Sequence, residues 1–280
     1  MNRVSIIIPC FNDGPYIMEA IESARAQTYP FKELIVIDDG STDAATKRIL
    51  EDLEKSDIKV LHTDHIGPAA ARNRGIAAAT GRYILPLDAD DKIEPTYLEK
   101  AVSILESNHK IGVVYCYAEL FGKKTGRWNL PDYSLSRMLL DNIVFVTAVF
   151  YRADWEAVGG FCEDLVYGLE DYDFWLSLLE LGREIYQIPE VLFRYRIKKK
   201  SRTTRLHDSQ EKMQATYQQI FENHKNLYKR NYDIVIPELR NMWMEQVFKC
   251  KKIEKILFFV KYIKEIPFLK KIALWFIKKT

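Results

Sequence analysis

The first half of the chain alternates short apolar runs with longer segments of helical period. The apolar runs are rich in β-branched residues and recur at residues 4–8, 34–37, 59–62 and 83–87. Runs of this kind are typical of parallel strands that are buried on both faces of a sheet. Helical patterns lie between them, near residues 16–27, 42–55 and 68–79. The alternation predicts an α/β fold built from a βαβ series with right-handed crossovers.

The second half of the chain is patterned less regularly. A helix is expected from Glu94-Pro95 to about residue 107, and it is followed by a buried strand at residues 111–117 and a second apolar run at residues 143–151. Another helix should begin near Glu170-Asp171 and run to Leu181, before a last strand at residues 191–196. From about residue 208 the pattern is helical throughout.

The C-terminal region predicts amphipathic helices. One face is apolar, and opposite it lie charged residues; the apolar face comprises Ile253, Ile256, Leu257, Val260 and Ile263. Pro267 interrupts this stripe, which restarts at Leu269. Such a region can lie on an anionic membrane surface, or it can pack as a helical hairpin on the body of the protein or on a partner in a homo-oligomer.

Charge separates this region from the rest of the chain. The formal net charge of the 280 residues is +2, but residues 241–280 hold ten lysines against three glutamates, which leaves −5 for residues 1–240. An acidic body with a basic tail argues against a nucleic-acid groove and favours an anionic surface that only the tail meets. The four cysteines are scattered and form no CxxC pair, and we find neither a leader peptide nor an apolar stretch of about 20 residues. These features predict a cytoplasmic protein that is at most peripheral at the inner face of the plasma membrane.

Acidic clusters follow two of the predicted strands. Asp38-Asp39-Gly40-Ser41 comes after residues 34–37, and Asp88-Ala89-Asp90-Asp91 comes after residues 83–87. Ligands of open α/β sheets bind outside the carboxyl ends of the strands, so both clusters should open onto one crevice. Because carboxylates repel an anion unless a cation bridges them, the pattern predicts a divalent metal, Mn²⁺ or Mg²⁺, that receives a nucleoside diphosphate.

Six motifs then carry a resemblance to a known family. They are Val4 to Asn12 (VSIIIPCFN), Ile37 to Asp43 (IDDGSTD), Ala71 to Gly75 (ARNRG), Gly81 to Asp91 (GRYILPLDADD), Gly159-Gly160-Phe161 and Glu170-Asp171. Their order and spacing resemble the family 2 inverting glycosyltransferases of the GT-A fold, over about residues 4–205. The resemblance implies a Rossmann-like nucleotide-binding half at residues 1–118, continuous with an acceptor-binding half at residues 119–207. Residues 208–280 would be a helical appendage.

The resemblance also implies roles for individual residues on the donor side. Asp90 would coordinate the metal, with Asp91 or Asp88 assisting. Asp39 would accept a hydrogen bond from the uracil N–H, and Pro9 and Phe11 would form a wall beside the base. Arg72 would face the nucleotide. Asn12 and Ala89 complete the expected donor site. The alternatives are local: Asp88 to Asp91 can end a strand and cap a helix, and Asp-Gly favours a β-turn.

On the acceptor side, Asp171 resembles the general base that removes the proton of the acceptor hydroxyl, and Glu170 would orient acceptor hydroxyls. The alternative is that both are favourable charges in a first helical turn. The segment Ser201 to Arg205, which follows Lys198 to Lys200, resembles a loop of the family that closes over the diphosphate. Together these features predict a metal-dependent inverting transferase that moves a sugar from a nucleoside diphosphate, most simply UDP, to a glycan or lipid-linked saccharide of a surface polysaccharide. A nucleotidyltransferase and a non-catalytic nucleotide-binding scaffold are the rival interpretations.

Overall fold

A computed structural model describes residues 2–198 and 209–263, and for residues 251–263 it describes the backbone alone. The chain divides into two compact units between Arg230 and Asn231. The expected closing loop at residues 201–205 and the expected break at Pro267 lie outside the described residues.

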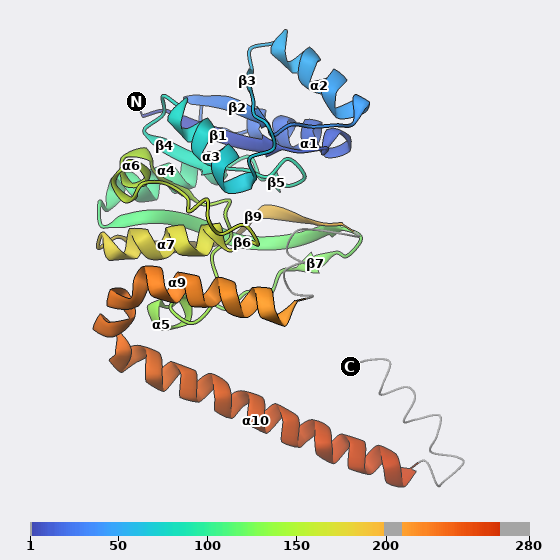
Figure 1. Cartoon of the computed structure of the whole chain (residues 1–280), viewed down its shortest axis with the longest axis vertical. Coiled ribbons are helices and arrows are strands. Elements are labelled where there is room, and N and C mark those ends of the chain that lie inside the picture. The colour runs from blue at the N-terminus through green and yellow to red at the C-terminus, as the bar shows by residue number, and fades with distance from the viewer. Residues whose placement is uncertain (1, 199–208, 264–280) are drawn as a thin grey trace. The chain divides into compact units, whose positions relative to one another are not determined.

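One mixed sheet forms the centre of the first unit (Figure 1). Its strands in the described residues are β1 (Val4–Cys10), β2 (Lys32–Asp38), β3 (Lys59–His62), β4 (Tyr83–Pro86), β5 (Lys92–Ile93), β6 (Ile111–Gly122), β7 (Gly126–Arg127), β8 (Val149–Tyr151) and β9 (Glu184–Ile197). They are ordered β3-β2-β1-β4-β8-β6-β9-β5, with β7 paired to β6. The first four strands are mutually parallel, which confirms the predicted βαβ series. β8 runs antiparallel to both of its neighbours and joins the two halves of the sheet.

The helices of the first unit are α1 (Gly14–Arg25), α2 (Ala44–Glu54), α3 (Pro68–Ala77), α4 (Tyr97–Ser107), α5 (Leu135–Met138), α6 (Arg152–Val158), α7 (Glu170–Glu180) and α9 (Gln210–Arg230). α3 packs closely on β1 and β2 because a glycine faces them. A Cβ on Gly75 would lie 2.6 Å from side-chain carbons of both Ile7 and Ile37. This close approach sets the N-terminal turns of α3 beside the strand ends.

Two predicted strands differ from the observed ones. The apolar run at residues 143–151 forms a strand only at its end, in β8. β9 begins at Glu184 rather than at residue 191, and it continues through Pro189 because a register shift there lets Ile188 pair with Cys116 and Val191 with Tyr117. A proline normally argues against a central strand, and the irregularity accommodates it.

α9 belongs to the first unit, beyond the boundary expected at residue 207, and lies along α7 (Figure 1). Buried His224, at a kink in α9, has one ring nitrogen 3.1 Å from the Asp173 carboxylate and the other 3.2 Å from Glu180. Although burial opposes its charge, these two carboxylates raise the pKa of His224. The contacts join α9 to the helix that carries Glu170 and Asp171.

The second unit contains α10 (Tyr232–Ile263). Several of its large apolar side chains are exposed at near-heptad spacing: Tyr232, Ile236, Leu239 and Trp243. Among the described helices, none is long and apolar enough to cross a membrane.

Candidate active site

The two acidic clusters follow the carboxyl ends of β2 and β4, the two strands that flank β1, as the sequence predicts. β1 lies between β2 and β4, and Cys10 at its end is in register with Asp38. The loops that follow β2 and β4 therefore leave the same edge of the sheet.

Arg72 joins the second cluster to the start of α7. Its Nη2 donates to Asp88 Oδ1 at 2.6 Å, and its Nη1 donates to Glu170 Oε1 at 2.7 Å. Arg72 and Glu170 are both buried, at 4% and 5% exposure. Burial opposes the charge on the guanidinium, yet the two carboxylates raise the pKa of Arg72. One planar side chain from α3 thus connects the strand-end aspartates with the helix that carries the expected base.

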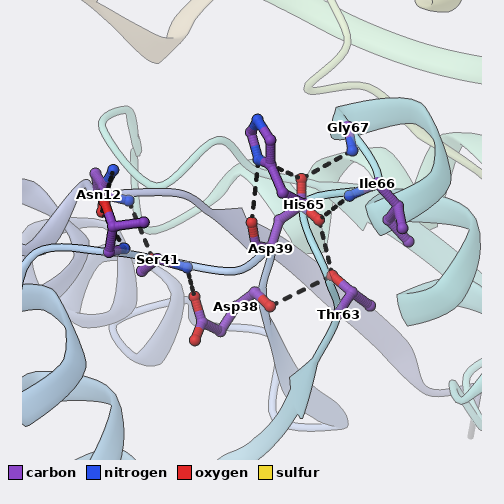
Figure 2. A network of polar contacts seen from close by, with 9 residues as sticks. Asn12, Asp38, Asp39, Ser41, Thr63, His65, Ile66 and Gly67 are labelled. Atoms are coloured by element: carbon purple, nitrogen blue, oxygen red, sulfur yellow. Dashed lines mark hydrogen bonds and ion pairs between the residues drawn. The ribbon is translucent and has the colours of Figure 1, made fainter.

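Asp39 is tied into the loop that precedes α3 (Figure 2). Its Oδ1 accepts from the backbone N–H of Ile66 at 2.7 Å, and its Oδ2 accepts from that of Gly67 at 2.9 Å. Thr63 Oγ1 also donates to Oδ1, at 2.8 Å. A carboxylate has about four lone-pair positions, so these three bonds leave room for one further donor.

An aromatic pair lies next to Asp39. The rings of Phe11 and His65 stack with centroids 4.1 Å apart, and Phe11 is 39% exposed. Phe11 therefore offers a partly exposed ring beside His65, whose Nδ1 lies 3.7 Å from Asp39 Oδ2, while Pro9 lies partly buried within β1. The stacking of His65 on Phe11 was not predicted from the sequence. His65 lies two residues before Gly67-Pro68, and its backbone adopts a positive φ of 52°.

Asn12 holds the first acidic loop from the other side (Figure 2). Its Oδ1 accepts from the backbone N–H of Thr42 at 2.7 Å and of Asp43 at 3.0 Å, and its own N–H donates to Ser41 Oγ. These bonds order the turn that leads into α2. Asn12 therefore shapes the loop that carries Asp39.

The second cluster divides into an outer and an inner part. Asp91 is 1% exposed and accepts from the backbone N–H of Arg196 at 2.8 Å, and burial together with Asp90 and Asp88 raises the pKa of Asp91 well above its ordinary value. Ala89 is also buried. Asp88 and Asp90 are the more accessible members, with side chains 33% and 15% exposed.

Asp90 already holds a cationic group. The ammonium of Lys198 lies 2.6 Å from Asp90 Oδ2 and 2.9 Å from Asp13 Oδ1. Burial and neighbouring Asp88 raise the pKa of Asp90, and Lys198 opposes that rise. Within the described residues there is no group of three or more His, Cys, Asp or Glu arranged to hold a metal. A pair of carboxylates nonetheless fits Mg²⁺ or Mn²⁺, which in nucleotide sites take one or two carboxylates and complete their coordination with phosphate oxygens and water.

Asp171 lies in the first turn of α7, next to Glu170. Its Oδ1 accepts from Asn142 Nδ2 at 3.1 Å and from the backbone N–H of Tyr172 at 2.9 Å. Burial, and secondly the charge of Glu170, raise the pKa of Asp171 to about 7, against the opposing effect of Arg72. A carboxylate with this pKa can accept a proton near neutral pH.

The aromatic residues around this turn belong to the core. Phe161, Tyr172 and Trp175 are buried, and Trp175 Nε1 donates to the carbonyl of Val144 at 3.0 Å. Trp175 therefore packs inside the protein.

Comparison with known proteins identifies the class to which this fold and arrangement belong. Residues 5–155 match the Glycosyl transferase family 2 domain. An uncharacterized glycosyltransferase of Haemophilus influenzae is 30% identical over 273 residues, covering 91% of this chain and 83% of that protein. An uncharacterized glycosyltransferase of Rickettsia prowazekii is 35% identical over 206 residues, covering 69% of this chain and 64% of that protein, so the chain spans less than two thirds of its length.

Solved structures agree on the fold. TarS residues 1–349 of S. aureus, in complex with UDP-GlcNAc, matches with a TM-score of 0.66 at 21% identity, over 79% of this chain and 66% of that chain. The mannosyltransferase PcManGT of Pyrobaculum calidifontis, in complex with GDP-Man and Mn²⁺, has a TM-score of 0.57 at 22% identity and covers 84% of this chain and 72% of its own. The chain belongs to glycosyltransferase family 2 and has the GT-A fold.

Replacing Arg72 by alanine should lower the free energy of unfolding by about 3–5 kcal/mol, because Glu170 would keep a buried charge without its main partner. Arg72→Lys should recover only part of this loss, since one ammonium cannot form the planar fork that spans Asp88 and Glu170. Denaturant midpoints measure the effect, and exposed Arg74→Ala in the same helix is the control. Equal midpoints for Arg72→Ala and Arg74→Ala would contradict the bridging role.

Proposed function

We propose that this glycosyltransferase moves a sugar, with inversion, from a UDP-linked donor to a hydroxyl of a glycan or lipid-linked saccharide in surface polysaccharide synthesis, and that it uses Mn²⁺ or Mg²⁺. The observation that carries the proposal is that Arg72 bridges Asp88 and Glu170, and that Glu170 is the sequence neighbour of Asp171, whose pKa is raised to about 7. The base and the leaving-group site thereby belong to one connected set of side chains. A TarS structure that contains UDP-GlcNAc and a PcManGT structure that contains GDP-Man support a nucleotide-sugar donor.

On the donor side, Asp39 would accept from the N–H of the uracil ring with its remaining lone pair, while Phe11 covers the base. Asp90, assisted by Asp88, would hold the metal, since both are more exposed than Asp91. When bound, the metal would neutralise the charge that develops on the departing diphosphate.

On the acceptor side, Asp171 would take the proton of the attacking hydroxyl while that oxygen bonds to the anomeric carbon and the bond to the diphosphate breaks. A base on the face opposite the leaving group is what inversion requires. Glu170 keeps Asp171 a good proton acceptor by its own charge, and Arg72 holds Glu170 in place.

We further propose an anionic membrane surface as the partner of the second unit. Tyr232, Ile236 and Trp243 of α10 expose apolar surface, and the ten lysines of residues 241–280 supply the charge that such a surface attracts. A lipid-linked acceptor would be found at the same surface.

Asp90→Ala should abolish metal-dependent transfer and leave the fold intact, because Asp90 lies at the edge of the cluster and not in the apolar core. Donor hydrolysis and transfer, measured over a range of Mn²⁺ concentrations, test this expectation. Asp64→Ala is a suitable control, since it removes an exposed carboxylate from the same edge of the sheet. Near wild-type turnover with unchanged metal dependence in Asp90→Ala would refute the metal assignment.

Asp171→Asn should lower the transfer rate by about 10² or more without weakening UDP binding, the effect expected for loss of a general base. In the wild type, kcat/KM should rise with pH through about 7, because only the deprotonated carboxylate accepts a proton. Asn142→Leu should move this rise in kcat/KM to higher pH, since it removes a hydrogen bond that stabilises the charged form of Asp171. If UDP affinity falls together with the rate in Asp171→Asn, Asp171 belongs to the donor site instead.

Deleting residues 231–280 should release the protein from vesicles that contain anionic lipid while donor hydrolysis continues, because the cut follows the boundary between the two units. Full-length binding should weaken at high salt, since each lysine near an anionic surface contributes about 1 kcal/mol that salt screens. Cosedimentation measures binding, and neutral vesicles are the control. Equal binding to neutral vesicles, or unfolding of the truncated protein, would contradict this role of the tail.

A further inference from the structure

Lys198 lies where a cation at the second acidic cluster would bind. Its ammonium is 2.6 Å from Asp90 Oδ2 and 2.9 Å from Asp13 Oδ1, two carboxylates that come from different loops. The ring of Tyr16 lies 5.6 Å away. The lysine is therefore held on several sides and forms the main ion pair of Asp90.

The end of β9 fixes the position of Lys198. Arg196, two residues earlier, donates from its backbone N–H to Asp91 Oδ1 and from its Nε to the carbonyl of Asp90 at 2.7 Å. Its guanidinium also pairs with Glu19 at 2.9 Å and stacks over Phe121 at 4.2 Å. This strand end is bound directly to the loop that carries Asp90, so Lys198 reaches Asp90 from an anchored backbone.

A divalent ion and this ammonium cannot both lie against Asp90 Oδ2. Mg²⁺ and Mn²⁺ bind carboxylate oxygens at about 2.0–2.2 Å, which would bring the metal next to the ammonium of Lys198. Two cations at that separation repel strongly in a partly buried site. A metal that binds Asp90 must therefore displace Lys198.

We propose that Lys198 is a positioning residue that competes with the divalent metal for Asp90, and that the displaced ammonium then binds the diphosphate of the donor. This inference rests on the proposed function, since it takes Asp90 as the metal ligand and a nucleoside diphosphate as the ligand. Metal binding without nucleotide is then weak because it must break two ion pairs. With a diphosphate present, the released ammonium gains a new anionic partner. Metal and nucleotide should consequently strengthen each other's binding by the same factor.

Mn²⁺ binding to the full-length protein tests the inference, with free Mn²⁺ measured by electron paramagnetic resonance and no transfer required. Without nucleotide, Lys198→Met should bind Mn²⁺ about tenfold more tightly than the wild type, because the competing cation is gone. Lys198→Arg should bind Mn²⁺ about as tightly as the wild type, because it keeps a competing cation at this position. Lys92→Met is the matched control: it removes the same charge near Asp90, but from a lysine that pairs with Glu19 at 2.9 Å, and it should change nothing.

UDP provides the second half of the test. The factor by which UDP tightens Mn²⁺ binding should be smaller in Lys198→Met than in the wild type, since no displaced ammonium is left for the phosphates. Adding Asp90→Asn to Lys198→Met should remove the gain in Mn²⁺ affinity.

Several results would overturn the inference. They are unchanged or weaker Mn²⁺ binding by Lys198→Met, a gain that survives Asp90→Asn, and an absence of Mn²⁺ binding in both proteins; Lys198→Gln repeats the test if the methionine variant does not fold. Should Lys198→Met bind Mn²⁺ more tightly while the wild type transfers no sugar from any UDP-linked donor, the proposed function fails and the competition stands.

Discussion

The buried guanidinium of Arg72 is the interaction on which the arrangement of the site depends. It binds Asp88, at the end of β4, and Glu170, at the start of α7. These two carboxylates are 82 residues apart in the sequence and belong to the two halves of the sheet that β8 joins. Without a shared cation, two carboxylates and their acidic neighbours would repel one another in a poorly solvated place. The arginine makes it possible for the acids at the end of β4 and at the start of α7 to lie together.

The same cation sets the electrostatics of the neighbouring groups. Burial, and secondly the charge of Glu170, raise the pKa of Asp171, whereas the guanidinium of Arg72 acts in the opposite direction. The result is a carboxylate poised near neutral pH, which general-base chemistry requires. On the other side, Asp88 forms an ion pair with Arg72 and also repels the nearby carboxylate of Asp90. The ammonium of Lys198 offsets this repulsion by pairing with Asp90.

The sequence predicts the parts that depend on local pattern. The strands β1 to β4, the helices between them and the position of both acidic clusters at strand ends follow from periodicity and from the rules of parallel sheets. What could not be predicted depends on contacts between distant segments. Nothing local indicates that Asp91 turns inward to Arg196, that Asn12 braces the loop of Asp39, or that β9 continues past Pro189.

The helical C-terminal region illustrates the same limit. Its periodicity is uniform from residue 208 onward, yet α9 is held to α7 by His224 and Asn223, while α10 belongs to a separate unit. Both helices are amphipathic, and in the structure the contacts of His224 and Asn223 with α7 distinguish α9 from α10. The +7 charge of residues 241–280 is the one sequence feature that points to different partners for the two segments.

The most direct test of the link between the two sides of the site is a carbon-13 NMR titration of the Asp171 carboxyl group in the wild type and in Asp88→Asn. We expect Asp171 to titrate near pH 7 in the wild type, because burial and the charge of Glu170 raise its pKa. Its pKa then falls in Asp88→Asn, because the guanidinium loses one compensating negative charge and its field at Asp171 becomes more positive. An Asp171 that titrates near 4 in the wild type, or whose pKa does not change in Asp88→Asn, would contradict the account.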